Sequence, residues 1–97
     1  MTIKEAKDTS MISNGFIPTL SDTLDELDKT TRNALAVEAK VRPLTINEIA
    51  NGKAKQITFT TMKKILDGLN QIAKEKGIDK TYTIEDVVKY EQKEDGE

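Results

Sequence analysis

The 97-residue chain contains no cysteine, no histidine and no tryptophan, and its aromatic residues are two phenylalanines and two tyrosines. The absence of cysteine excludes a disulfide framework or a thiolate metal site, and it fits a reducing compartment. Without histidine or cysteine, the commonest acid–base, nucleophilic and zinc-binding side chains are missing. We therefore expect a protein that is not an enzyme and that uses neither a cofactor nor a metal.

Long hydrophobic runs are also missing. No apolar stretch approaches the roughly 20 residues that are needed to span a bilayer. The first ten residues, MTIKEAKDTS, lack the apolar run of a signal peptide. We expect a soluble, cytoplasmic chain without a membrane partner, and the apolar fraction of 36% indicates a small core with polar ends.

A net positive charge is found only in the middle of the chain. Residues 29–65 contain eight lysines and arginines and two glutamates, which gives a local charge of +6. Residues 1–28 and 66–97 each carry −4, so the whole chain has a net charge of −2. An acidic protein that gathers its cations in one segment is expected to present that segment to phosphates.

Apolar residues recur with the helical period of 3.6 residues in several segments, which predicts an all-α protein, a small bundle of about five helices. The predicted helices cover residues 21–29, 32–39, 43–51, 59–76 and 84–90. We expect residues 1–15 to be a flexible leader and residues 16–90 to be the folded domain. Residues 91–97 are expected to be an acidic, flexible tail.

Three signals bound the two short helices in the middle of the chain. Thr30 or Thr31 is suited to cap the helix over residues 32–39, because either side chain can accept a hydrogen bond from a free N–H. Pro43 fits the first position of the next helix, where its missing N–H costs nothing, and Gly52 is expected to end that helix. Helices this short must be stabilised by packing.

The later part of the chain is predicted to form one long and one short helix. Thr58 is suited to cap the long helix, whose apolar stripe begins at Phe59. Thr83 followed by Asp86 resembles a capping box and is expected to open the short helix over residues 84–90.

Short motifs follow one another between residues 31 and 69. They are Leu35-Ala36, Val41, Arg42-Pro43-x-Thr45-Ile46, Asn51-Gly52-Lys53 and Ile57-Thr58-Phe59-x-Thr61-Met62-x-x-Ile65. In this order and spacing they resemble the Cro/cI family of helix-turn-helix proteins (lambda-repressor-like, Xre-type). The resemblance implies that residues 16–90 form a DNA-binding domain, with the helix over residues 43–51 in the major groove.

Three features depart from the family pattern, and one of them is a connection before Thr31 that is shorter than usual. Lys40 occupies the turn position that the family usually fills with glycine, so we expect it in a left-handed conformation at a cost of about 1 kcal/mol. The helix that starts near Phe59 runs about two turns beyond the usual length. We interpret this extension as either a dimerisation surface or an added layer over the core.

The resemblance implies two sets of DNA contacts. The set that faces base edges is Arg42, Pro43, Leu44, Thr45, Asn47 and Glu48. The set that contacts phosphates is Thr31, Arg32, Asn33, Lys40, Lys53 and Lys55. By base-edge chemistry, Asn47 suits adenine, Glu48 suits the cytosine amine, and Leu44 suits the thymine methyl. Thr45 is equally suited to cap its own helix.

These observations favour a sequence-specific regulator that binds double-stranded DNA, with a repressor of phage or mobile-element type as the expected kind. We expect it to bind its operator as a homodimer. The alternative is a protein-interaction module that keeps the fold, such as an antirepressor, an adaptor or an antitoxin, with a regulatory protein as its partner. The acidic flanks, Leu44 and Glu48 favour this alternative.

Overall fold

The structure, a computed structural model, describes residues 10–92. In this part of the chain the fold consists of four α-helices, two 3-10 turns and a two-stranded antiparallel sheet. In chain order the elements are η1 (Ile12–Asn14), β1 (Phe16–Pro18), α1 (Leu20–Glu26), α2 (Arg32–Ala39), α3 (Pro43–Ala50), α4 (Phe59–Glu75), η2 (Ile84–Asp86) and β2 (Val88–Tyr90). The protein is therefore mostly helical, but the prediction of five helices without a sheet is wrong.

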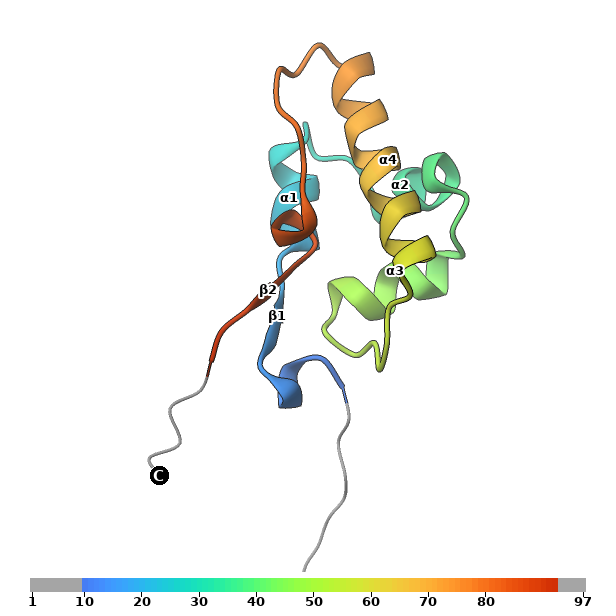
Figure 1. Ribbon diagram of the computed structural model, residues 1–97. Helices are drawn as coiled ribbons and strands as arrows, with labels where there is room; N and C mark the ends of the chain where they lie inside the picture. The colour runs from blue at the N-terminus through green and yellow to red at the C-terminus, as the bar shows by residue number, and fades with distance from the viewer. Residues whose placement is uncertain (1–9, 93–97) are drawn as a thin grey trace, which may run out of the picture.

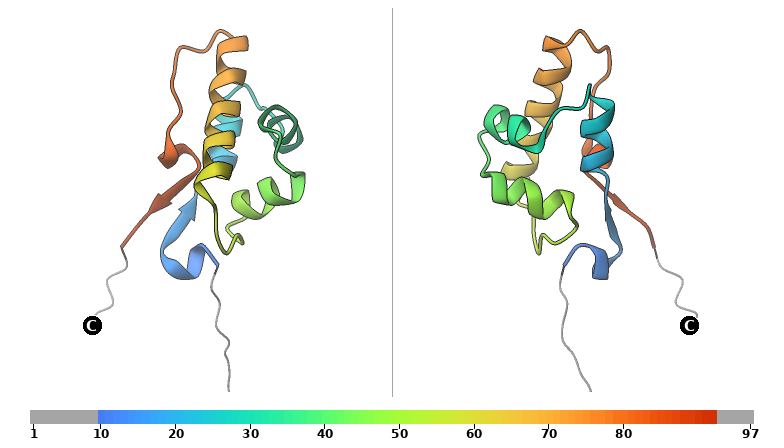
Figure 2. Two further views of the ribbon diagram at one scale, coloured as in Figure 1. Left: turned by 45° about the vertical axis from the view of Figure 1, so that its right-hand side comes forward. Right: turned by 180° about the vertical axis from the view of Figure 1, so that it is seen from behind.

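The long helix α4 lies between two layers (Figure 1). Helices α2 and α3 pack on one side of it, and α1 lies on the other side with the small sheet (Figure 2). The core between these layers is aliphatic. Its fully buried large side chains are Leu20, Leu27, Leu35, Ile46, Ile49, Ile65, Leu69 and Val87.

Helices α2 and α4 approach closely at Gly68. A Cβ atom at this position would lie 3.0 Å from the Ala39 Cβ and 3.2 Å from the Ala39 Cα. A glycine inside a helix costs about 1 kcal/mol relative to alanine, and the close packing explains why it is tolerated. Further along α4, Ile72 and Ala73 are buried. The extension of this helix is therefore an added layer over the core.

The predicted helix over residues 84–90 is wrong. The Thr83 N–H donates to the Asp86 carboxylate at 2.8 Å, as a capping box requires, but it opens only the 3-10 turn η2. The chain then becomes extended, and β2 pairs antiparallel with β1, with Phe16 opposite Tyr90. Valines and a tyrosine suit a strand, and pairing with a distant segment overrides the local helical signal.

The first helix and its surroundings also differ from the prediction. Helix α1 ends at Glu26, and both Asp28 and Lys29 have a positive φ, 56° and 54°. Residues 10–15 of the expected leader belong to the fold, because the Met11 side chain is buried and its N–H donates to the Ala54 carbonyl at 3.0 Å. The remaining leader residues, 1–9, and residues 93–97 of the expected tail lie outside the described residues.

Phe59 is not a core residue, contrary to the predicted apolar stripe of α4. Its side chain is 91% exposed, whereas Met62, one turn later, is 9% exposed. The helical period places Phe59 above Met62, but the first turn of α4 extends beyond the layer that covers the rest of the stripe. An aromatic side chain is therefore left on the surface.

Candidate nucleic-acid interface

Local hydrogen bonds define the beginning of α2 and the turn that follows it. The Thr31 hydroxyl accepts from the Ala34 N–H at 3.0 Å, so Thr31 rather than Thr30 is the cap. Lys40 has φ 60° and ψ 44°, which confirms the predicted left-handed turn. The Val41 N–H then donates to the Ala36 carbonyl at 3.0 Å. Helix α2 has the predicted bounds, and the turn directs the chain into α3.

Helix α3 begins and is held as the sequence predicts. Pro43 occupies its first position after an extended Arg42. Ile46, Ile49 and Ala50 are buried and fix one side of the helix against the core. The opposite side therefore faces solvent along the whole helix.

The end of α3 needs glycine at position 52. Gly52 has φ 77°, and a Cβ atom there would lie 2.6 Å from the Ile12 Cδ1 and 3.2 Å from the Pro18 Cγ. The next N–H, that of Lys53, donates to the Glu48 carbonyl at 2.8 Å. The N-terminal segment thus packs over the end of α3 and fixes the loop that carries Lys53.

The residues expected to face bases are not equally accessible. Leu44 is 65% exposed, and Glu48 lies one turn further along the exposed face of α3. Arg42 and Pro43 are also exposed, whereas Thr45 and Asn47 are half-buried at the sides of the helix. The centre of this face is therefore formed by a leucine and a carboxylate.

Arg32 joins three helices. Its Nη1 donates to the Oδ1 of Asn47 at 3.2 Å and to the Oδ1 of Asn51 at 3.1 Å, and its Nη2 donates to the Ser21 hydroxyl at 3.0 Å. The guanidinium thus links α2 to α1 and α3, and it is half-buried. The resemblance predicts that Arg32 contacts a DNA phosphate. The structure adds a second role, because the Arg32 guanidinium fixes the Asn47 amide.

Within residues 10–92, the cations at the two ends of α3 have no acidic partners. Lys40 and Arg42 before the helix, and Lys53 and Lys55 after it, are exposed and form no ion pair within residues 10–92. Three lysines elsewhere do have carboxylate partners, in the pairs Lys63–Asp67 at 2.6 Å, Lys76–Asp28 at 3.2 Å and Lys80–Glu26 at 2.7 Å. Thr31 and Asn33 lie exposed at the start of α2.

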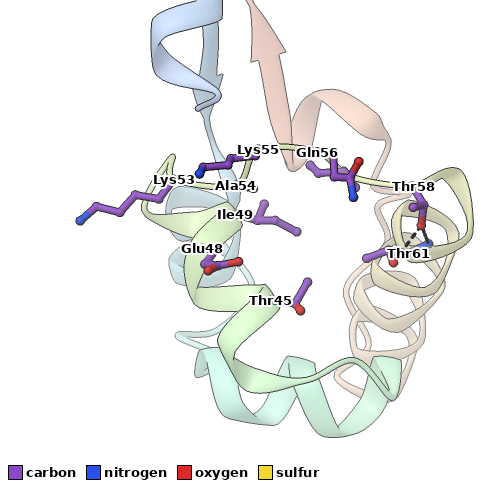
Figure 3. A pocket seen from close by; sticks show the side chains of 10 residues that line it. Thr45, Glu48, Ile49, Lys53, Ala54, Lys55, Gln56, Thr58 and Thr61 are labelled. Carbon is purple, nitrogen blue, oxygen red and sulfur yellow. Dashed lines mark hydrogen bonds between the residues drawn. The ribbon is translucent and has the colours of Figure 1, made fainter. Parts of the chain in front are cut away.

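A groove of about 430 Å³ separates α3 from the beginning of α4. Thr45 and Ile49 point into it from α3 and Thr61 points into it from α4, whereas Lys53 points away (Figure 3). The Thr58 hydroxyl caps α4 by accepting from the Thr61 N–H at 3.1 Å. The positive end of the α4 dipole thus borders the groove that Lys55 also lines. Sequence reasoning treated Thr58 only as a cap and left this helix end out of the interface.

No group of three or more Asp, Glu, His or Cys side chains within residues 10–92 is placed to hold a metal ion. In the same part of the chain, no helix has both the length and the apolar character to cross a membrane. Comparisons with protein-family models, with curated proteins and with solved structures give no match.

Proposed function

We propose that the protein is a sequence-specific regulator that places α3 in the major groove of a double-stranded DNA operator. The observation that carries the proposal is a set of four cations at the two ends of this helix that form no ion pair within residues 10–92: Lys40, Arg42, Lys53 and Lys55. Cations of this kind keep their charge available for phosphates. The free N–H groups at the start of α4 supply a further phosphate contact.

The shape of α3 supports the same proposal. An α-helix with its side chains is about 10–12 Å in diameter, and it fits a major groove that is about 12 Å wide. Leu44 and Glu48 occupy the centre of its exposed face, where they reach a thymine methyl and a cytosine amine. Arg32 holds the Asn47 amide in place at the side of the helix, so Asn47 loses little side-chain freedom when it contacts a base.

A repressor that occupies its operator as a homodimer fits this surface best. Two copies related by a dyad would read half-sites about 34 Å apart. The protein would then act in the cytoplasm, where the DNA of a phage or mobile element is accessible.

A second candidate function has a specific observation in its favour. Leu44 on α3 is 65% exposed and Val37 on α2 is 70% exposed, so each of the two helices carries an exposed apolar side chain, and the exposed Glu48 lies one turn after Leu44. Such a surface also suits a protein partner, as in an antirepressor, an adaptor or an antitoxin.

Selection of bound sequences from random duplex DNA separates the two candidates. We expect the full chain to enrich a motif, and we expect Arg42→Ala and Lys53→Ala each to weaken binding to that motif about tenfold. Lys63→Ala is the control, because Lys63 is paired with Asp67 away from α3. The absence of any enriched motif from the wild-type selection would overturn the DNA-binding proposal.

A further inference from the structure

An apolar groove of about 570 Å³ lies between the two-stranded sheet and the beginning of α4. The loop over residues 54–57 lines both this groove and the groove beside α3. The apolar side chains that line it are Met11, Phe16, Ala54, Ile57, Phe59, Met62 and Val88. Its only charged lining residue within residues 10–92 is Lys55.

Phe59 projects at the rim of this groove. Its side chain is 91% exposed, although the groove beside it could accept an aromatic ring. Phe16 lies on the other wall and packs against Tyr90, with their ring centroids 5.2 Å apart. The same surface therefore presents a projecting aromatic side chain and a hollow lined by apolar side chains.

The exposed aromatic area is large for a small monomer. Phe59, Tyr90 and Phe16 are 91%, 61% and 39% exposed. Aromatic side chains of this size carry about 150–250 Å² each, so their exposed parts provide roughly 300–500 Å². Most of the roughly 600 Å² per partner that a weak, reversible interface needs is thus available in one place.

We propose that a second copy of this chain covers the groove, with the Phe59 ring of each copy inserted into the groove of the other. A dyad requires one surface that is complementary to itself, and here the projecting ring and the groove lie side by side. The charge in the contact is small, because Lys55 is the one charged lining residue within residues 10–92 and Lys63, one turn after Phe59, is paired with Asp67 at 2.6 Å. The extension of α4 offers no comparable surface, since Ile72 and Ala73 are buried within their own protomer.

This inference rests on the proposed function only in its expectation of two copies on one operator, and it names the surface that joins them. Lys55 lines both grooves, so a dimer formed here would hold two DNA-facing surfaces next to the dyad. We expect a weak, reversible dimer with a dissociation constant on the order of micromolar.

Sedimentation equilibrium of the full chain tests the proposal. We expect the mass to rise from 10.8 kDa toward twice that value as the concentration passes through the micromolar range. Phe59→Ser is expected to weaken the dimer roughly 30-fold or more, because the ring is the central anchor. Val37→Ser is the matched control, since Val37 is 70% exposed on α2 and does not line the groove. Circular dichroism checks that both variants keep the wild-type fold.

Cross-linking provides an independent readout, because the chain has no cysteine of its own. Gln56→Cys places a thiol on the groove wall, and Thr60→Cys places one next to Phe59. A mixture of these two chains is expected to form mixed disulfides on oxidation, whereas Val37→Cys is not. A wild-type chain that stays monomeric, or a dimer whose dissociation constant Phe59→Ser leaves unchanged, overturns the proposal. A monomer that still selects a DNA motif overturns this inference alone, and a dimer that selects none overturns only the proposed function.

Discussion

The helix-turn-helix unit (residues 31–58) and the terminal layer (residues 11–27 and 78–91) are stabilised by different kinds of contact. In the helix-turn-helix unit the defining hydrogen bonds join residues that are close in sequence. The Ala34 N–H donates to the Thr31 hydroxyl, and the Val41 N–H donates to the Ala36 carbonyl. In the terminal layer the defining hydrogen bonds join opposite ends of the chain, since the Thr23 hydroxyl donates to the Asp86 carbonyl at 2.6 Å. The first unit is encoded locally, and the second forms only when both ends of the chain meet.

The two regions also differ in how their charges are used. In the terminal layer, the carboxylate of Glu26 forms an ion pair with Lys80 at 2.7 Å. The cations around α3 have no such partners among residues 10–92. We infer that the terminal layer supports the fold, whereas the helix-turn-helix unit keeps its charge for a ligand.

The largest stability effect is expected where the helix-turn-helix unit packs on α4. Gly68→Val would place a branched side chain where even a Cβ atom lies 3.0 Å from the Ala39 Cβ. We expect the free energy of unfolding to fall by about 2–3 kcal/mol, measured by urea denaturation. Lys64→Val on the exposed face of α4 is the control, with an expected loss of about 0.5 kcal/mol. Equal losses in the two variants would contradict the close α2–α4 contact.

A smaller effect is expected where the two regions meet, at Gly52. Gly52→Ala combines a positive φ with a Cβ that meets the Ile12 side chain at 2.6 Å. We expect a loss of about 2 kcal/mol, of which about 1 kcal/mol is backbone strain. Gly77→Ala is the matched control, because Gly77 has φ 71° and nothing within 4 Å of its Cβ position.

The double variant Gly52→Ala/Ile12→Ala lacks the contact between the added Cβ and the Ile12 side chain. We expect it to recover the part of the stability loss of Gly52→Ala that exceeds the stability loss of Gly77→Ala. A Gly52→Ala variant that loses no more stability than Gly77→Ala would show that the N-terminal turn does not pack over α3 in solution.

The smallest effect is expected in the terminal layer and has the opposite sign. Tyr82 is 2% exposed, and its hydroxyl has no hydrogen-bond partner within residues 10–92. Tyr82→Phe removes this unpaired group, so we expect the free energy of unfolding at pH 7 to rise by about 1 kcal/mol.

The pH dependence provides a second check on Tyr82. Burial raises the pKa of the Tyr82 hydroxyl above its ordinary value of 10.0. The unfolded chain therefore releases this proton first, and the wild type loses stability as the pH rises above 10. Tyr82→Phe lacks this loss, so its advantage should increase between pH 9 and about pH 11. If the stability difference between Tyr82→Phe and the wild type stayed constant between pH 9 and about pH 11, the Tyr82 hydroxyl would have to be in contact with water.

The sequence predicts the helix-turn-helix unit well because its signals are local. The cap at Thr31, the left-handed Lys40, Pro43 at the first position of α3 and the stop at Gly52 each act within a few residues. The sheet is not predictable in the same way, because residues 88–90 look helical until Phe16–Pro18 is available to pair with them. Pairing across some seventy residues leaves no local pattern.

The candidate site was predicted less completely than the fold around it. The exposed positions of Leu44 and Glu48 follow from the helical period, and the structure places them where that period requires. The hydrogen bonds from Arg32 to Asn47 and Asn51 depend on how α2 and α3 cross, which no short motif specifies. The exposure of Phe59 likewise depends on where the neighbouring layer ends.

The central claim is that the unpaired cations around α3 bind DNA phosphates, and the salt dependence of affinity tests it most directly. With four phosphate contacts, log affinity for the selected motif should fall with log salt at a slope of about −3 to −4. Lys53→Gln should reduce this slope by about 1, and Lys63→Gln, whose ammonium is paired with Asp67, should leave it unchanged. A flat salt dependence, or equal effects of the two substitutions, would contradict the account.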